Sequence, residues 1–343
     1  MASKRHIHLV GSINLPNAEE AMTTASDIMG KGLLRLPDGE PGPRRGWIFY
    51  QRPMFTHNRY LDAPDHNETG AADHAHLPRV LRPGVRPEDI EFPELGYARE
   101  ARLSYAWFCK ARAEGRIPGH LRFQVSLPTP FAVLTPAVAP ECIADVEPAY
   151  EAAMLREVAQ IAAEIPHHDL AMQWDICLEM CLFDGQWNIA TPFDEACHRA
   201  RLRRLTCAVP ADVHLGAHLC YGDYDGKHII QPRDATRMTA FANMVTQEAG
   251  RPLQWIHMPV PIDRKDDAFF SPLAGLKLHS ETELYLGLVH LRDGVDGTQA
   301  RIHAAEKYVH NFGVATECGI GRMHSRSDIR ELFRIHSVAI EGS

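Results

Sequence analysis

The chain has 343 residues, 45% of them hydrophobic, which is enough to bury the core of one large α/β domain over residues 1–343. Its formal net charge is −8 and its basic residues are scattered, so we expect no nucleic-acid partner. No segment approaches the ~18 consecutive apolar residues of a membrane span and no signal peptide precedes the first apolar run, so we expect a cytoplasmic protein with no membrane partner.

Short apolar runs alternate with longer amphipathic stretches, a pattern typical of repeated βα units and a parallel sheet. The predicted strands are 6–10, 32–36, 121–126, 170–177, 213–219, 253–258, 283–289 and 311–315, although 283–289 could also continue a helix. The predicted helices are 19–29, 97–114, 147–164, 192–206, 234–248 and 297–308. Because a closed (β/α)8 barrel needs eight strands, the sequence predicts a single TIM barrel.

Two segments interrupt this alternation. Residues 47–93, after the second predicted strand, are polar and rich in Pro, Gly, His and Asp. Loops of that length in a compact domain are usually functional lids or oligomer contacts, so we expect a lid over the barrel mouth and consider a homodimer. Residues 263–277, which are charged and then apolar, are a second candidate for a lid.

In such a barrel the active site forms at the C-terminal ends of the strands. Gly11 and Ser12 end the first strand, where N–H groups and a hydroxyl can hold a carboxylate, although such a pair is more often a simple turn. Asp38 and Glu40 follow the second strand beside two arginines, either as a site for a charged substrate or as a solvated turn with surface ion pairs. Asp175 interrupts the apolar fourth strand, and a buried carboxylate needs a cationic or hydrogen-bonding partner.

Thiol and imidazole groups follow the later strands. His218 and Cys220 project to the same side of an extended segment by its two-residue period, and Cys318 follows the eighth strand. Eight cysteines in so long a chain do not make a disulfide framework. Thiolates with a neutral imidazole suit Zn²⁺, so the sequence predicts a zinc site across the barrel mouth.

A closed zinc sphere needs three or four ligands. His257, after the sixth strand, is the further ligand candidate, and Glu317 is its competitor. His290 ends the seventh strand. Taken alone, either histidine fits a structural role better than a ligand role. Their grouping with the two cysteines strengthens the case for metal binding.

Short motifs recur in order along nearly the whole chain. They are Val-Gly-Ser at 10–12, Gly-Glu-Pro at 39–41, Gln-Trp-Asp at 173–175, His-Leu-Cys-Tyr at 218–221 and Cys-Gly at 318–319. This order resembles the catalytic C-terminal barrel of cobalamin-independent methionine synthase, which carries Ile-Gly-Ser, His-Gly-Glu-Pro, Gln-Ile-Asp-Glu-Pro, His-Met-Cys-Tyr and Asp-Cys-Gly. The related uroporphyrinogen decarboxylase barrel shares the architecture but lacks the zinc motif.

The resemblance implies two sites. One would hold an amino acid, with its carboxylate on Gly11 and Ser12 and its ammonium group between Glu40 and Asp175. The other would hold zinc through the histidine and the two cysteines named above. The family moves a methyl group from a folate to homocysteine.

The chain also departs from that family. His257 stands where the family has a glutamate ligand, which removes a negative charge from the ligand set. The family's Asp-Ile-His after the seventh strand appears here as His-Leu-Arg at 290–292, and our catalytic candidates are Asp175 and His290. Val-Leu-Thr at 133–135 replaces the family's pterin-stacking Asn-Trp-Ser, so the use of a folate donor stays open.

The function that follows is a zinc-dependent methyl or alkyl transferase in which zinc activates a thiol substrate. The substrate is expected to be a small thiol or amino acid. A zinc-dependent lyase or hydrolase acting on a small polar substrate in the same site is the alternative. Thiol dependence separates the two, because only the transferase consumes a thiol stoichiometrically.

Overall fold

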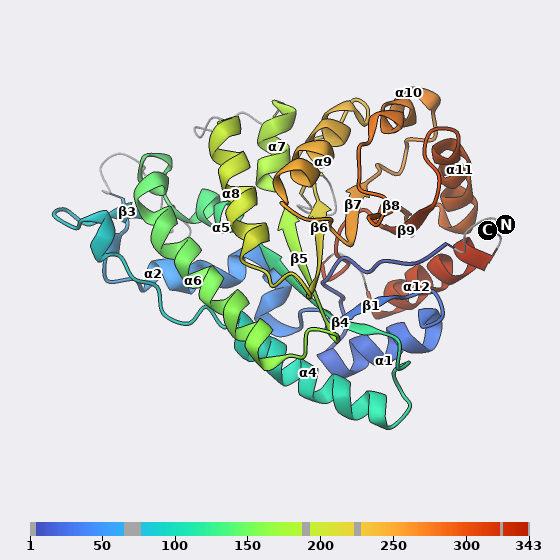
Figure 1. The fold of residues 1–343 in the computed structure, drawn as a ribbon, viewed down its shortest axis with the longest axis horizontal. Coiled ribbons are helices and arrows are strands. Elements are labelled where there is room, and N and C mark those ends of the chain that lie inside the picture. Colours follow the sequence, from blue (N-terminus) through green and yellow to red (C-terminus); the bar gives the residue numbers. More distant parts are fainter. Residues whose placement is uncertain (1–4, 65–76, 187–192, 223–227, 323–324, 342–343) are drawn as a thin grey trace.

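The structure, a computed structural model, describes residues 5–64, 77–186, 193–222, 228–322 and 325–341. Its centre is a curled sheet of seven parallel strands in the order β1-β4-β5-β6-β7-β8-β9, and the helices surround these strands (Figure 1). The strands are β1 (Arg35–Pro37), β4 (Arg122–Pro128), β5 (Leu170–Ile176), β6 (His214–Leu219), β7 (Trp255–Pro259), β8 (Glu283–Val289) and β9 (Phe312–Thr316). The α/β class and the positions of these seven strands therefore agree with the sequence prediction.

The N-terminal segment reaches both edges of the sheet. Ile7 forms parallel bridges with Leu33 beside β1 and with Val314 in β9. The Ile7 N–H donates to Gly32 O at 2.8 Å, and the His8 N–H donates to Val314 O at 2.9 Å. The prediction of a regular strand at 6–10 is wrong because this segment pairs through single bridges, yet these bridges give the curled sheet a TIM-barrel-like arrangement.

The six predicted helices are confirmed within a few residues, apart from Pro192 at one predicted end, which lies outside the described residues. They are α1 (Ala18–Met29), α4 (Tyr97–Ala113), α6 (Ile143–Glu164), α8 (Glu195–Cys207), α9 (Thr236–Glu248) and α11 (Gly294–Glu306). The sequence analysis missed α2 (Arg52–Thr56), α5 (Pro130–Ala137), α7 (Leu178–Asp184), α10 (Asp267–Phe270) and α12 (Arg326–Glu341). All of these except α12 have eight residues or fewer, and α5 carries an internal proline. None of the described helices is long and apolar enough to cross a membrane.

Side chains fill the inside of the sheet. Every residue of β5, β7 and β9 is buried, as expected for parallel strands covered on both faces. The Trp255 indole lies where a Cβ at Gly216 would be, so the glycine in β6 makes room for the ring. The indole N–H donates to Gln173 Oε1 at 3.0 Å, and the Arg35 guanidinium lies 4.2 Å from the centre of the ring.

The segment after β1 folds into short elements: the 3-10 helices Gly42–Gln51 and Pro87–Asp89, helix α2, and the two-stranded antiparallel sheet of β2 (Leu61–Asp62) and β3 (Val80–Leu81). Residues 65–76 of the expected lid lie outside the described residues. Much of the remainder packs on α6, where the rings of Phe55 and Phe92 each lie 5.1 Å from that of Tyr150. The second lid candidate, 263–277, packs on α9, and Lys277 N–H donates to Asn243 Oδ1 at 2.7 Å.

Candidate functional site

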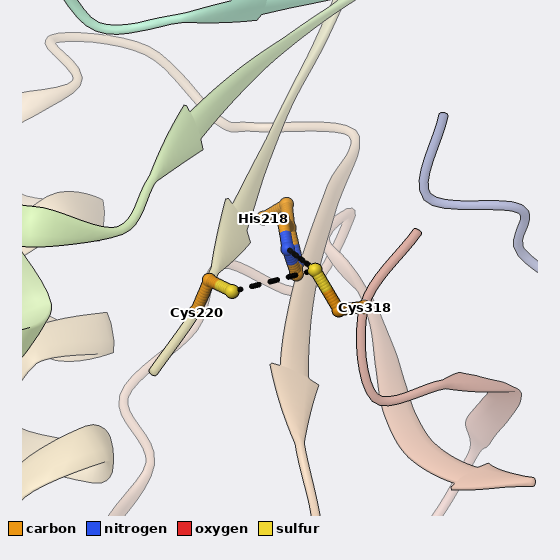
Figure 2. Close-up of side chains that lie close together, drawn as sticks. All are labelled: His218, Cys220 and Cys318. Carbon is orange, nitrogen blue, oxygen red and sulfur yellow. Dashed lines mark hydrogen bonds between the residues drawn. The ribbon is translucent and has the colours of Figure 1, made fainter. Parts of the chain in front are cut away.

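A histidine and two cysteines meet at the C-terminal ends of β6 and β9. His218 is in β6, Cys220 follows that strand, and Cys318 follows β9. Their ligand atoms all lie within 4.8 Å of one another, and Figure 2 shows the three side chains pointing toward a common point. The two Sγ atoms are 3.6 Å apart, and Cys318 Sγ is 3.8 Å from His218 Nε2 (Figure 2).

The Sγ–Sγ distance and the distance from Cys318 Sγ to His218 Nε2 are close to those around a tetrahedral zinc ion. With Zn–S bonds of about 2.3 Å and Zn–N bonds of about 2.1 Å, tetrahedral angles place two sulfurs about 3.8 Å apart and a sulfur and nitrogen about 3.6 Å apart. Both cysteines are free thiols. The hydrogen bond with Cys177 and burial raise the pKa of the Cys220 thiol well above its usual range, and a bound cation would favour the thiolate instead.

His257 lies behind His218, outside this cluster. The two residues are register partners on the parallel strands β6 and β7. His218 Nδ1 is 2.6 Å from His257 Nδ1, and His257 Nε2 is 3.0 Å from the carbonyl oxygen of Thr316. Burial lowers the pKa of His257 to about 3. Both of its ring nitrogens thus face protein partners, which does not support the expectation that His257 binds the metal directly.

The cluster opens into a cavity of about 240 Å³. The cavity wall also includes the candidate substrate residues after the first, second and fourth predicted strands, which are Gly11, Ser12, Glu40 and Asp175. An aromatic and aliphatic wall comes from residues 46–49, Leu178 and Ile229. The structure therefore brings three of the four predicted metal residues and four of the five predicted substrate residues to one cavity, without His257 and Asp38.

Glu40 and Asp175 give this cavity an unusual pair of carboxyl groups. Burial, and then the charge of Asp175, raise the pKa of Glu40 to about 8. Burial also raises the pKa of Asp175 to about 7, although hydrogen bonds from Gln173 and Trp47 oppose the shift. The Gln173 amide donates to Asp175 Oδ1 at 2.8 Å. Two desolvated carboxyl groups at one cavity favour a cationic ligand, because a positive charge stabilises both ionised forms.

Asp38 does not line the cavity. Its Oδ1 accepts the Glu40 N–H at 2.9 Å, its Oδ2 accepts the Ser104 hydroxyl at 2.6 Å, and Arg44 Nη2 donates to the same Oδ2 at 2.7 Å. Glu40 has a φ of 50°, a conformation that non-glycine residues seldom adopt. The bond from Asp38 supports this turn, so the structure places Asp38 beneath Glu40 rather than at the cavity wall.

His290 and Glu317 lie beside the cluster. His290 Nε2 donates to Val260 O at 2.9 Å, and its Nδ1 is 4.0 Å from Glu317 Oε2. The same carboxylate oxygen lies 3.1 Å from His228 Nε2. Although burial opposes ionisation, the nearby imidazole of His228 lowers the pKa of Glu317. Glu317 is therefore engaged by histidines, and neither it nor His290 is among the residues that line the cavity.

Trp47, Cys177 and Arg322 are among the cavity residues that the sequence analysis missed. Trp47 has φ 50° and ψ −120°, so the backbone is strained where its side chain bonds to Asp175. A tryptophan directly after the Pro- and Gly-rich turn was the available signal. Cys177 is fully buried, and only the structure places it beside Cys220.

Comparison with known proteins identifies the fold. No family model matches the sequence, and no curated protein matches it. A putative vitamin-B12-independent methionine synthase from Listeria monocytogenes superposes with a TM-score of 0.57 at 12% identity, covering 100% of this chain and 98% of that one. A B12-independent methionine synthase from Shewanella sp. W3-18-1, solved in complex with selenomethionine, gives a TM-score of 0.58 at 12% identity over 99% and 97%. This chain therefore has the fold of B12-independent methionine synthase-like proteins over its whole length.

Proposed function

We propose that this protein is a zinc-dependent transferase that moves a methyl or alkyl group to the thiol of a small amino-acid substrate. The observation that carries the proposal is one cavity whose wall holds two kinds of group. The wall includes a histidine and two thiols that could hold a metal, and two buried carboxyl groups. An aminothiol in this cavity can present its sulfur to the thiol and imidazole groups and its ammonium group to the carboxyl groups.

His218, Cys220 and Cys318 would hold the zinc ion. Zinc bound there supplies Lewis-acid chemistry, lowering the pKa of a thiol at an open coordination position. Three protein ligands leave that position available, which is the usual arrangement of catalytic rather than structural zinc sites. The proposed roles of Glu40 and Asp175 are to bind and orient the substrate ammonium group, so that its thiol is held toward the metal.

The substrate carboxylate would lie at Gly11 and Ser12. The Ser12 hydroxyl accepts the Gly321 N–H at 3.2 Å, and an added Cβ at Gly11 would lie 2.6 Å from Glu40 Oε1. The backbone is thus close enough to Glu40 for one amino-acid head group to contact both. The Shewanella relative was solved with selenomethionine, an amino acid with a chalcogen side chain, which agrees with this substrate class.

We also propose that the sheet and the N-terminal segment together form the closed (β/α)8 barrel, and that residues 46–49 act as the inner edge of a lid. Their contribution to the cavity wall supports this assignment. His290 Nδ1 lies 4.0 Å from Glu317, the residue before Cys318, so we assign His290 a supporting role in proton transfer rather than direct contact with substrate.

Metal content and thiol consumption test the proposal. The purified protein should contain one zinc per chain, and a methyl donor should cause stoichiometric loss of free aminothiol. Cys220→Ala should lose the zinc and the activity while its circular dichroism spectrum stays that of the parent. Cys207→Ala is the matched control, since Cys207 is an exposed cysteine away from the cluster. Full zinc occupancy in Cys220→Ala would refute the metal site, and turnover without loss of thiol would favour a lyase or hydrolase.

A further inference from the structure

Two buried histidines and a backbone carbonyl form a chain of hydrogen bonds that ends at the metal cluster. We propose that His257 is a positioning residue that holds His218 with its Nε2 lone pair facing the metal, and that the site has three protein ligands. This inference rests on the proposed function in so far as it concerns a metal. The carrying observation is the continuous path from Thr316 O through His257 to His218 Nδ1, at 3.0 Å and 2.6 Å.

The donor and acceptor roles along these hydrogen bonds follow from the carbonyl oxygen of Thr316. A carbonyl oxygen only accepts hydrogen bonds, so His257 Nε2 must carry a proton and donate it. A neutral imidazole has one N–H, which leaves His257 Nδ1 as an acceptor. At 2.6 Å, His218 Nδ1 must then be the donor. The remaining nitrogen, His218 Nε2, keeps its lone pair, and this is the nitrogen that lies 3.8 Å from Cys318 Sγ.

The fold leaves little freedom for another arrangement. His218 and His257 are 2% and 0% exposed, so neither ring exchanges its partner for water. The rings are register partners on neighbouring parallel strands, with centroids 4.7 Å apart. The ring of His8 packs 5.8 Å from that of His257 on another side. Turning His257 toward the metal would break both hydrogen bonds and leave a buried carbonyl unpaired, which costs about 1–3 kcal/mol.

The chain of hydrogen bonds also ties the ligand-bearing elements together. His218 belongs to β6, His257 to β7, and Thr316 ends β9 two residues before Cys318. The Thr316 hydroxyl donates to Cys318 O at 2.8 Å. His257 therefore connects both ends of the metal cluster without contributing a ligand. Two thiolates would balance the charge of a divalent cation, and a three-ligand site would leave one coordination position for substrate.

Glutamine and phenylalanine at 257 separate positioning from ligation. A glutamine can donate from its amide nitrogen to the carbonyl and accept at its oxygen from His218, whereas phenylalanine can do neither. We expect His257→Gln to bind Co²⁺ about as tightly as the parent, with the same thiolate-to-cobalt charge-transfer absorption. His257→Phe should bind about 10–100-fold more weakly, the usual effect of losing an outer-sphere partner. A spectrum of His257→Gln that shows the loss of a nitrogen ligand would overturn the inference.

His336 provides the matched control. It is also fully buried, and its Nδ1 lies 2.7 Å from the Leu332 carbonyl within α12, away from the cluster. His336→Phe should leave cobalt affinity unchanged. If it weakens binding as much as His257→Phe does, the effect reports general destabilisation and the inference fails.

A measurement on the metal-free protein keeps this inference separate from the proposed function. Nitrogen-15 NMR of histidine-labelled protein, with the His218 signals identified by their loss in His218→Gln, reports which ring nitrogen carries the proton. We expect Nδ1–H in the parent and in His257→Gln, and a mixture of tautomers in His257→Phe. A parent His218 protonated at Nε2 would overturn the inference. If the tautomer is as expected but the parent binds neither zinc nor cobalt, the proposed function fails and the positioning role of His257 stands.

Discussion

Removing the charge of Glu40 should weaken substrate binding without affecting the metal. If the carboxylate makes a charge-assisted hydrogen bond to the substrate ammonium group, Glu40→Gln loses about 1.5–3 kcal/mol. At 1.4 kcal/mol per tenfold change, this loss raises the KM for the aminothiol by about 10–150-fold. Zinc content should stay at that of the parent, because Glu40 is not one of the three proposed metal ligands.

The pH dependence of substrate affinity provides a second test of the role of Glu40. Since the pKa of Glu40 is raised to about 8, the free protein holds this carboxyl protonated at lower pH, and binding an ammonium group requires its ionisation. Affinity should therefore rise as the pH increases toward 8, and Glu40→Gln should flatten that part of the rise. Calorimetric titration of the aminothiol across this range measures both effects.

Stability should change in the opposite sense. The ordinary pKa of a glutamate is 4.5, so the unfolded chain releases the Glu40 proton before the folded protein does. The stability of the ligand-free protein should then fall as the pH rises from about 4.5 to about 8, and the fall should be smaller in Glu40→Gln. Thermal unfolding at several pH values tests the sign. A variant with the parent's KM, pH dependence and stability profile would refute the reasoning and make the Gly-Glu-Pro turn a scaffold.

Two further predictions concern the framework of the site. Asp38→Asn leaves the guanidinium of Arg44, whose side chain is 12% exposed, without its nearest ionic partner, and should lower the free energy of unfolding by up to about 3–5 kcal/mol. Urea denaturation measures this, and an unchanged midpoint would contradict the supporting role of Asp38. Gly216→Ala places a methyl group in the Trp255 indole and should cost about 1–3 kcal/mol. Gly119→Ala, which meets no atom within 4 Å, is its control, and equal losses in both variants would exclude the overlap as the cause.

Local pattern was enough to predict most strands of the sheet and part of the histidine and cysteine cluster. Buried parallel strands read as short apolar runs, so β4 to β9 appear in the sequence within a few residues of their observed bounds. The two-residue period of an extended segment is sufficient to place His218 and Cys220 on the same side of the chain. The places of Cys318, Glu40 and Asp175 after predicted strands also pointed to these residues, and the order of the short motifs along the chain then implied their roles.

Pattern failed where an element is short or paired by few bonds. Helices α5 and α7 have 8 and 7 residues, too few for a clear helical period, and α5 also contains prolines, which are poor helix formers. The segment at 6–10 resembles a strand because its apolar side chains are buried, yet its backbone makes only isolated bridges. The amphipathic face of α12 was present in the sequence and was overlooked.

The sequence by itself determined which residue types stand at the strand ends, whereas the tertiary structure decided what each of them contacts. His257 was predicted as a ligand because a histidine after the sixth predicted strand can bind zinc. Its ring nitrogens are instead directed to His218 and Thr316. Asp38 was predicted to bind substrate, but its oxygens are occupied by the Glu40 N–H and by side chains from other elements. The physical reason is that a hydrogen bond depends on distance and direction across strands, which strand register and side-chain packing determine and local periodicity does not.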